Sequence, residues 1–238
     1  MSENIKKTTK AFRVDLNSSE NQSILKPIAR YSFHNQAHQV NEAVKKIDKL
    51  IKNAPYSNDD IILNHNKIKE AFFSPFKPQL KNAQVFLSHS HADKNKALEV
   101  KNYLESETNH KVFVDSLFWD YKDDVLNELA EYDDISRIED AFTLILRESL
   151  QDMIEKCPYF VFLQSKNSVS FNQNLLKITY SAWIYEELKI AHSISKGYLT
   201  LSFEQEQGLE IKIENDISPF LESFETITLK KLSQQINS

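Results

Sequence analysis

The stretch LSHSHADK contains two histidines and an aspartate at alternating positions, directly after an apolar run. Imidazole and carboxylate groups are common metal ligands, so His89-x-His91-x-Asp93 first suggests a metal site. A first-row metal needs more ligands than these three residues supply. The only histidines further along the chain, His110 and His192, have no acidic or histidine neighbour at ligand spacing. The sequence therefore predicts no metal and no bound cofactor.

The same stretch also fits the start of a helix. Ser90-x-x-Asp93 is a capping pattern, in which Ser90 accepts a backbone N–H and Asp93 faces the positive end of the helix dipole. Capping does not explain His89 and His91, which we expect at the carboxyl end of a predicted strand. Ligands of open α/β sheets bind at that end of the strands. We therefore expect this stretch to cap a helix and to form one wall of a site.

Composition excludes several classes of protein. The 238 residues include one cysteine, Cys157, so neither an internal disulfide nor a four-thiolate zinc site is expected. The two glycines, Gly197 and Gly208, cannot supply a glycine-rich phosphate loop. No apolar run is long enough to span a membrane, and the first residues lack the apolar core of a secretory signal. These features predict a cytoplasmic protein without a membrane partner.

The charges are unevenly distributed along the chain. Residues 1–80 carry 13 basic and 8 acidic side chains, whereas residues 81–238 carry 16 basic and 26 acidic ones. An acidic main domain repels a phosphate backbone, so nucleic acid is not an expected partner. The basic residues of the first segment fit the solvated face of a helix.

Hydrophobic periodicity divides the chain at about residue 80. Residues 1–30 read as irregular, and two helices follow, one over 35–53 and a second capped by Ser57. From residue 81 onward, strands and helices alternate, which favours a parallel sheet covered on both faces. We therefore expect a helical extension and linker over 1–80 and a main domain over 81–238. The predicted strands are 83–89, 111–116, 158–165, 198–203 and 225–229, with helices over 95–106, 141–157, 181–195 and a last turn near 230–237.

Four segments in order resemble the bacterial TIR (Toll/interleukin-1 receptor) domain. They are VFLSHSHADK, KVFVDSLFWD, LRESLQDMIEKCPYFVFLQSKNSVS and SAWIYEELKIAHS, and together they cover about residues 82–230. In that family the first strand ends in a phrase similar to LSHSHAD, and a Ser-x-Trp-x-x-x-Glu-Leu helix follows the third strand. The resemblance implies a flavodoxin-like five-stranded parallel sheet of order 2-1-3-4-5 with helices on both faces.

The resemblance also implies a function. Many bacterial TIR domains cleave NAD+ at the nicotinamide–ribose bond, often in anti-phage defence, and release ADP-ribose or a cyclic ADP-ribose isomer. The family's catalytic glutamate matches Glu187. Active TIR domains assemble through TIR–TIR contacts, so a homo-oligomer is expected, as is a downstream effector that senses a nucleotide product. The alternative is a non-catalytic TIR adaptor that acts through self-association or docking.

The chemistry supports a single carboxylate. Nicotinamide leaves NAD+ as a neutral molecule, so no general acid is needed, and one carboxylate can stabilise the cationic ribose that remains. Glycosidases need two carboxyl groups because their leaving group must be protonated. Glu187 lies four residues after Trp183 and shares its helix face, beside the apolar face of Ile184 and Leu188. Glu186 is turned about 100° away, toward solvent.

The remaining candidates are expected at strand ends, where they would contact the substrate. Asp115 is positioned for a ribose hydroxyl, although a turn or helix cap explains it nearly as well. Trp119, expected in the loop after the second strand, suits either stacking on a base or covering the core. Two segments, 121–140 and 168–181, are longer than in the family and border the expected site. The substrate-binding candidates are Ser88, His89, Ser90, Asp115, Trp119 and Trp183.

Overall fold

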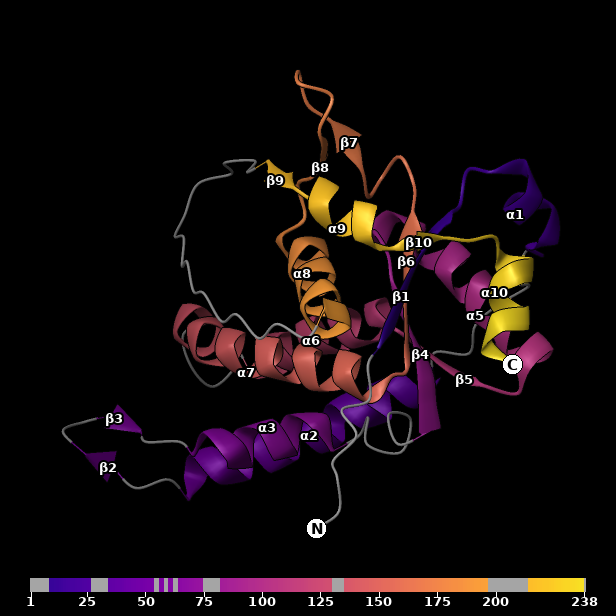
Figure 1. Cartoon of the computed structure of the whole chain (residues 1–238). Helices are drawn as coiled ribbons and strands as arrows, with labels where there is room; N and C mark the ends of the chain where they lie inside the picture. The colour runs from indigo at the N-terminus through magenta and orange to yellow at the C-terminus, as the bar shows by residue number, and fades with distance from the viewer. Residues whose placement is uncertain are drawn as a thin grey trace, which may run out of the picture. The chain divides into compact units, whose positions relative to one another are not determined.

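A computed structural model of the chain describes residues 9–26, 34–53, 56–57, 60–61, 64–74, 82–129, 135–196 and 214–237 (Figure 1). For residues 34–40, 56–57, 60–61, 117–120, 129, 135–141 and 143 it describes the backbone alone. The chain forms two compact units, of which the first contains the main sheet and the second is mainly helical.

The first unit is built on a five-stranded sheet in which every pair of neighbours is parallel. The central strands are almost continuously apolar, as expected for strands covered on both faces, and Val85, Phe86, Leu87 and Phe160 are fully buried. The predicted α/β class with a flavodoxin-like parallel sheet is confirmed. In spatial order the strands are β5 (Lys111–Val114), β4 (Ala83–Ser88), β6 (Tyr159–Gln164), β1 (Lys10–Asp15) and β10 (Glu225–Thr226).

The predicted strand order 2-1-3-4-5 needs one correction. The fourth place is taken by β1, which pairs with β6 along its whole length, from Lys10 opposite Tyr159 to Asp15 opposite Gln164. The expected fourth strand, 198–203, lies outside the described residues. The prediction that residues 1–30 are irregular is therefore wrong for β1. The signal was an alternation of apolar residues, because Phe12, Val14 and then Leu16 are all buried.

Helices lie on both sides of this sheet. α8 contacts β1 and α9, whereas α5 contacts β5 and α10, and the two groups lie on opposite sides of the strands in Figure 1. The predicted helices over 95–106 and 181–195 are confirmed by α5 and α8. The helices of this unit are α1 (Ser19–Ile24), α5 (Lys94–Thr108), α8 (Ala182–Lys196), α9 (Ser218–Ser223) and α10 (Leu229–Ile236).

The long segment before α8 folds as a hairpin rather than as an open loop. β7 (Ser170–Phe171) and β8 (Lys177–Thr179) pair in antiparallel fashion, and β9 (Asn215–Asp216) adds a third short strand beside β8. In Figure 1 the turn between β7 and β8 projects away from the main sheet of this unit.

The second unit contains α2 (His34–Lys52), α3 (His65–Phe73), α6 (Asp115–Leu129) except for its first residue, and most of α7 (Ile135–Lys156). The predicted boundary at residue 80 does not separate the two units, because β1 joins the sheet and α6 and α7 join the N-terminal helices. Periodicity describes each element alone and carries no information on which distant elements pack together. Figure 1 labels two further short strands of this unit, β2 (Tyr56–Ser57) and β3 (Asp60–Ile61).

Aromatic side chains form the core of the second unit. The ring of Phe72 packs edge-to-face against Phe73, Tyr121 and Phe142, with centroid distances of 5.0, 5.1 and 5.7 Å. The hydroxyl of Tyr121 donates a hydrogen bond of 2.7 Å to the carbonyl of Phe72, and burial raises the pKa of this phenol. The predicted cap at Ser57 is wrong, because Ser57 lies in β2. Instead, Asn64 Oδ1 accepts from the backbone N–H of Lys67, 3.1 Å away, and starts α3.

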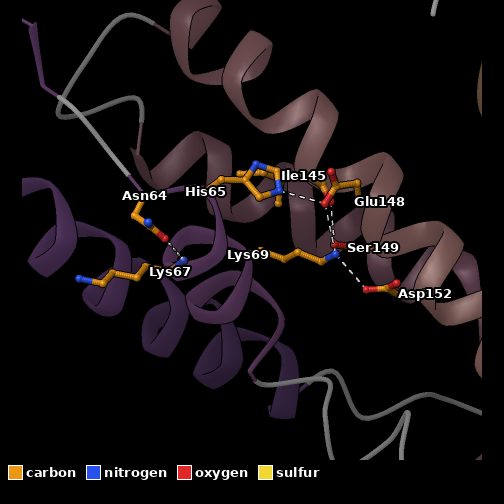
Figure 2. Close-up of polar contacts among 8 residues, drawn as sticks. All are labelled: Asn64, His65, Lys67, Lys69, Ile145, Glu148, Ser149 and Asp152. Carbon is orange, nitrogen blue, oxygen red and sulfur yellow. Dashed lines mark hydrogen bonds and ion pairs between the residues drawn. The ribbon is translucent and has the colours of Figure 1, made fainter. Parts of the chain in front are cut away.

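Ion pairs connect α3 to α7 within this unit (Figure 2). Nε2 of His65 lies 2.9 Å from a carboxylate oxygen of Glu148, and Nζ of Lys69 lies 2.9 Å from Asp152 and 3.4 Å from the same Glu148 oxygen. The hydrogen bond from His65 lowers the pKa of Glu148, and Lys69 acts in the same direction. The side chain of Glu148 is 45% exposed, so solvent and salt screen these interactions.

Replacing Glu148 with glutamine is expected to lower the free energy of unfolding by less than about 1 kcal/mol, because exposed ion pairs contribute little. The difference should shrink further at high salt. Urea unfolding at low and high ionic strength measures it, with Glu128→Gln, an exposed carboxylate of α6, as the matched control. A loss of several kcal/mol would contradict a screened surface network.

Among the helices in the described part of the chain, none is both long enough and apolar enough to cross a membrane.

Candidate functional site

Three buried polar contacts surround the end of β4. The strands β5, β4 and β6 are parallel neighbours, so their carboxyl ends meet at one edge of the sheet. Ser88 is the last residue of β4, Asp115 directly follows β5, and Ser165 directly follows β6. All three side chains are buried. Ligands of open α/β sheets bind at this edge, which makes it the candidate site.

The first contact joins β4 to α8. Ser88 Oγ donates a hydrogen bond of 2.5 Å to Oε2 of Glu187. Ser88 is 0% and Glu187 1% exposed, so this bond lies inside the protein. Hydrogen bonds from hydroxyls to ionised carboxylates have this short length. The pair therefore fixes the orientation of the Glu187 carboxylate at the sheet edge.

The sequence of α8 explains why Glu187 is buried there. Ser181 Oγ accepts the backbone N–H of Ile184 at 3.2 Å and starts the helix. Ile184, Leu188 and Ala191 are buried, which confirms the predicted apolar face. Glu187 lies next to Leu188 at the edge of this apolar face, so it is buried together with the face.

The neighbouring Glu186 has a different environment. Its side chain is 22% exposed and lies 3.8 Å from the ammonium of Lys189. The prediction that Glu186 is turned toward solvent is wrong, because its side chain is half-buried and one of its carboxylate oxygens is fully buried. Glu187 is nevertheless the more buried of the two glutamates.

The second contact joins β4 to β5. Nε2 of His89 lies 2.9 Å from Asp115 Oδ1, in an ion pair without good hydrogen-bond alignment. The other ring nitrogen, Nδ1, donates to the carbonyl of Ser90 at 2.6 Å, and the backbone N–H of His89 donates to Asp115 Oδ2 at 3.3 Å. Burial alone would lower the pKa of His89, but the charge of Asp115 and these hydrogen bonds outweigh it and raise the pKa. The structure thus holds a buried histidine–aspartate pair.

The third contact joins the helix after β4 to the loop after β6. Asp93, which is buried, accepts hydrogen bonds from Ser165 Oγ and from Asn167 Nδ2, the latter at 2.9 Å. The predicted capping hydrogen bond from Ser90 is absent, whereas Asp93 does occupy the N-cap position of α5, although its side chain forms no capping hydrogen bond. Asp93 holds a neighbouring loop instead. Ser165 and Asn167 were not among the predicted site residues. Their position just after the buried strand β6 could have indicated that they lie at the same sheet edge.

Removing the Asp93 carboxylate is expected to destabilise this loop. Asp93→Ala leaves the buried Ser165 hydroxyl without its acceptor, so we expect a loss of about 2 to 3 kcal/mol. Urea unfolding measures this loss, and proteolysis after Lys166 should become faster. Glu107→Ala, which removes an exposed carboxylate of α5, should change neither result. Equal stability of the two variants would show that the Asp93 contacts contribute nothing.

The three remaining predicted site residues, Ser90, Trp119 and Trp183, take no part in these three contacts. Ser90 is half-buried after β4, and Trp183 is half-buried one helical turn before Glu187. Trp119 was expected in a loop, but its backbone belongs to α6, which begins directly after β5. Its side chain lies outside the described residues. Of the six substrate-binding candidates, Ser88, His89 and Asp115 gather with Glu187 at the strand ends.

His91, the remaining histidine of the opening motif, is exposed, and both ring nitrogens of His89 contact protein atoms. Within the described residues, no group of three or more His, Cys, Asp or Glu side chains is arranged to hold a metal ion. The site therefore offers a buried carboxylate, a hydroxyl and an ion pair.

Comparison with protein-family models, with curated proteins and with solved structures found no match to this chain.

Proposed function

We propose that the protein cleaves NAD+ at the nicotinamide–ribose bond, with Glu187 as the catalytic carboxylate. The observation that carries this proposal is the Ser88–Glu187 hydrogen bond at the carboxyl edge of the parallel sheet. A carboxylate that is already oriented loses little energy to reorganisation when positive charge develops beside it. The resemblance of the four segments to TIR domains supports the same residue.

In this mechanism the bond between ribose C1′ and the nicotinamide nitrogen breaks, and its electron pair moves to the positively charged ring. Nicotinamide leaves as a neutral molecule. The positive charge then resides on the ribose as an oxocarbenium ion, which the Glu187 carboxylate stabilises. Water attacks C1′ and releases a proton to give ADP-ribose, or a nucleophilic atom of the same nucleotide attacks to give a cyclic ADP-ribose isomer.

The other candidates have distinct roles in the proposal. Ser88 orients Glu187, and the His89–Asp115 pair fixes the end of β4 beside β5. Ser90 and Trp183 retain some exposure and are the residues we assign to substrate contact. Trp119 stays a substrate-binding prediction. No resident cofactor is required, because NAD+ is the substrate.

The burial of Glu187 adds a requirement. A carboxylate that is 1% exposed cannot touch the ribose of NAD+ until the residues covering it move. We propose that assembly of several copies, or substrate itself, opens this site. In the proposed setting, a cytoplasmic defence response, a nucleotide product would then signal to a downstream effector.

The experiment is nicotinamide release from NAD+ by the purified full chain, across a range of protein concentrations and with a crowding agent. Release that increases with protein concentration is the expected result. Chromatography of the nucleotide then separates ADP-ribose from a cyclic product. Absence of release under all these conditions would count against the enzyme.

A non-catalytic TIR adaptor is the second candidate. The observation that favours it is again the burial of Glu187. A buried Glu187 that accepts a hydrogen bond from Ser88 can have a purely structural role, in which it connects β4 to α8. An adaptor would self-associate without releasing nicotinamide, which distinguishes it from the enzyme.

A further inference from the structure

Two hydrogen-bond acceptors lie side by side at the carboxyl edge of the main sheet, outside the three contacts that surround the end of β4. Gln164 is the last residue of β6 and Asp15 the last residue of β1, and the two are opposite each other in the parallel ladder. Both side chains are half-buried. This edge pair, Asp15 and Gln164, therefore lies where ligands of open α/β sheets bind.

The edge pair shares a face of the sheet with the Ser88–Glu187 contact. Opposed residues of a parallel ladder point to the same face, as do alternate residues along a strand. Ser88 is opposite Phe162, which lies two residues before Gln164. Strands about 4.8 Å apart, with a rise of about 3.3 Å per residue, place the Cα atoms of Gln164 and Asp15 about 8 and about 12 Å from that of Ser88. A ligand that reaches Glu187 can therefore extend along this face to the edge pair.

Each residue of the edge pair has an oxygen that no donor in the described part of the chain satisfies. Oε1 of Gln164 is buried and accepts no hydrogen bond from these residues. Asp15 Oδ1 accepts the backbone N–H of Asn17 at 2.8 Å, and Oδ2 has no hydrogen bond or ion pair with a described residue. A buried acceptor without a donor costs free energy, which a donor on a ligand recovers. The two oxygens are therefore available to a ligand with two donors.

Two acceptors on neighbouring strands suit two hydroxyl groups on adjacent carbon atoms. The negative charge of Asp15 strengthens a hydrogen bond from such a hydroxyl. In dinucleotide-binding sheets a carboxylate that accepts from a ribose hydroxyl selects NAD+, because the 2′-phosphate of NADP+ would meet a like charge. Arg13, two residues earlier in β1, donates to Thr226 Oγ1 of β10, so its charge is directed away from Gln164 of β6. The edge pair thus favours a free diol over a phosphorylated one.

We propose that Asp15 and Gln164 bind the 2′- and 3′-hydroxyls of the adenosine ribose and select NAD+ over NADP+. This inference rests on the proposed function, in which Glu187 contacts the other ribose, the one that bears nicotinamide. A pyrophosphate bridge separates the two riboses of NAD+, so the second ribose must lie some distance from Glu187 along the sheet edge, as the edge pair does. β1 lies outside the four segments that resemble TIR domains, so the resemblance does not imply this site.

Nicotinamide release from NAD+ and from NADP+ by the full chain tests this selection. The wild type should prefer NAD+ at least about a hundredfold in kcat/KM, and Asp15→Asn should lower this preference at least about tenfold by improving the use of NADP+. Asparagine keeps an oxygen for the N–H of Asn17, so the turn after β1 persists. The matched control is Asp216→Asn, which should leave the preference unchanged. Asp216 accepts the N–H of Ser218 at 2.9 Å in the same kind of turn, but it is exposed and belongs to the short three-stranded sheet.

A second variant separates substrate binding from a structural role. Gln164→Leu removes the acceptor and keeps much of the side-chain volume. It should raise the KM for NAD+ at least about tenfold with kcat nearly unchanged, because the contact is the same in the ground state and the transition state. Its free energy of unfolding should equal or exceed that of the wild type, since an unsatisfied buried acceptor is removed. A residue with a structural role alone would instead lose stability and leave KM unchanged.

The outcomes distinguish this inference from the proposed function. Equal use of NAD+ and NADP+ by an active wild type, a preference that survives Asp15→Asn, or an unchanged KM in Gln164→Leu would overturn the diol site and leave cleavage by Glu187 intact. If the wild type releases nicotinamide from neither substrate, the proposed function fails, and calorimetric titration with NAD+ and NADP+ then decides on the diol site. Tighter binding of NAD+ that Asp15→Asn abolishes would support it, whereas equal binding or none would overturn it.

Discussion

Glu187→Gln is expected to reduce nicotinamide release from NAD+ by at least about a hundredfold, the usual loss when an electrostatic stabiliser of a transition state is removed. Glutamine has nearly the same shape, and its amide oxygen can still accept the hydrogen bond from Ser88 Oγ. The fold should therefore persist, while the negative charge beside the cationic ribose is lost. Release of nicotinamide under conditions in which the wild type is active is the measurement.

The matched control is Glu186→Gln. Glu186 lies on the same helix and is half-buried, with Lys189 3.8 Å from its carboxylate. Its replacement should leave the rate within about twofold of the wild type, since this charge does not lie beside Ser88. If Glu187→Gln releases nicotinamide at the wild-type rate, Glu187 is not the catalytic carboxylate.

The sequence predicted the elements that carry the candidate site. Continuous apolar runs predicted β4, β5 and β6, and the apolar spacing of Ile184, Leu188 and Ala191 predicted the buried face of α8. These signals are local, because burial on both faces of a strand or on one face of a helix leaves its own periodicity. The placement of Glu187 at the edge of the core, near the strand ends, followed from them, whereas its contact with Ser88 of β4 did not.

Membership of the sheet was not predictable in the same way. In β1, buried apolar residues such as Phe12 and Val14 alternate with less buried ones, which is typical of a strand. The local sequence does not indicate, however, that this strand pairs with β6, nearly 150 residues away. Trp119 was expected in the loop after the second strand, yet the backbone is helical from Asp115 onward. Asp93 fitted a capping pattern but bonds to residues after a distant strand. Long-range partners override each of these local preferences.

The pair formed by His89 and Asp115 should govern stability at the same sheet edge. Asp115→Asn removes the negative charge beside the buried ring of His89, and removing one partner of a buried pair costs about 3 to 5 kcal/mol. We expect the lower end, about 3 kcal/mol near pH 6, because His89 can release its proton when its partner is neutral. Urea unfolding of the wild type and of Asp115→Asn measures the difference.

The pH dependence has a definite sign. The pKa of His89 is raised in the folded protein above its ordinary value of about 6.5, so the folded state holds this proton more tightly than the unfolded state. The stabilisation is complete below pH 6.5 and is lost as the pH rises through the folded-state pKa. The gap between the wild type and Asp115→Asn should therefore narrow from pH 6 toward alkaline pH.

A control separates this effect from the loss of any histidine. His91 is exposed two residues later, so His91→Gln should follow the wild-type stability curve, whereas His89→Gln should lose the stabilisation that the wild type shows below pH 6.5. A gap between wild type and Asp115→Asn that stays constant from pH 6 to alkaline pH would mean that His89 is neutral in the folded protein. In that case Asp115 would act through its 3.3 Å hydrogen bond from the backbone N–H of His89 rather than through the charge of the ring.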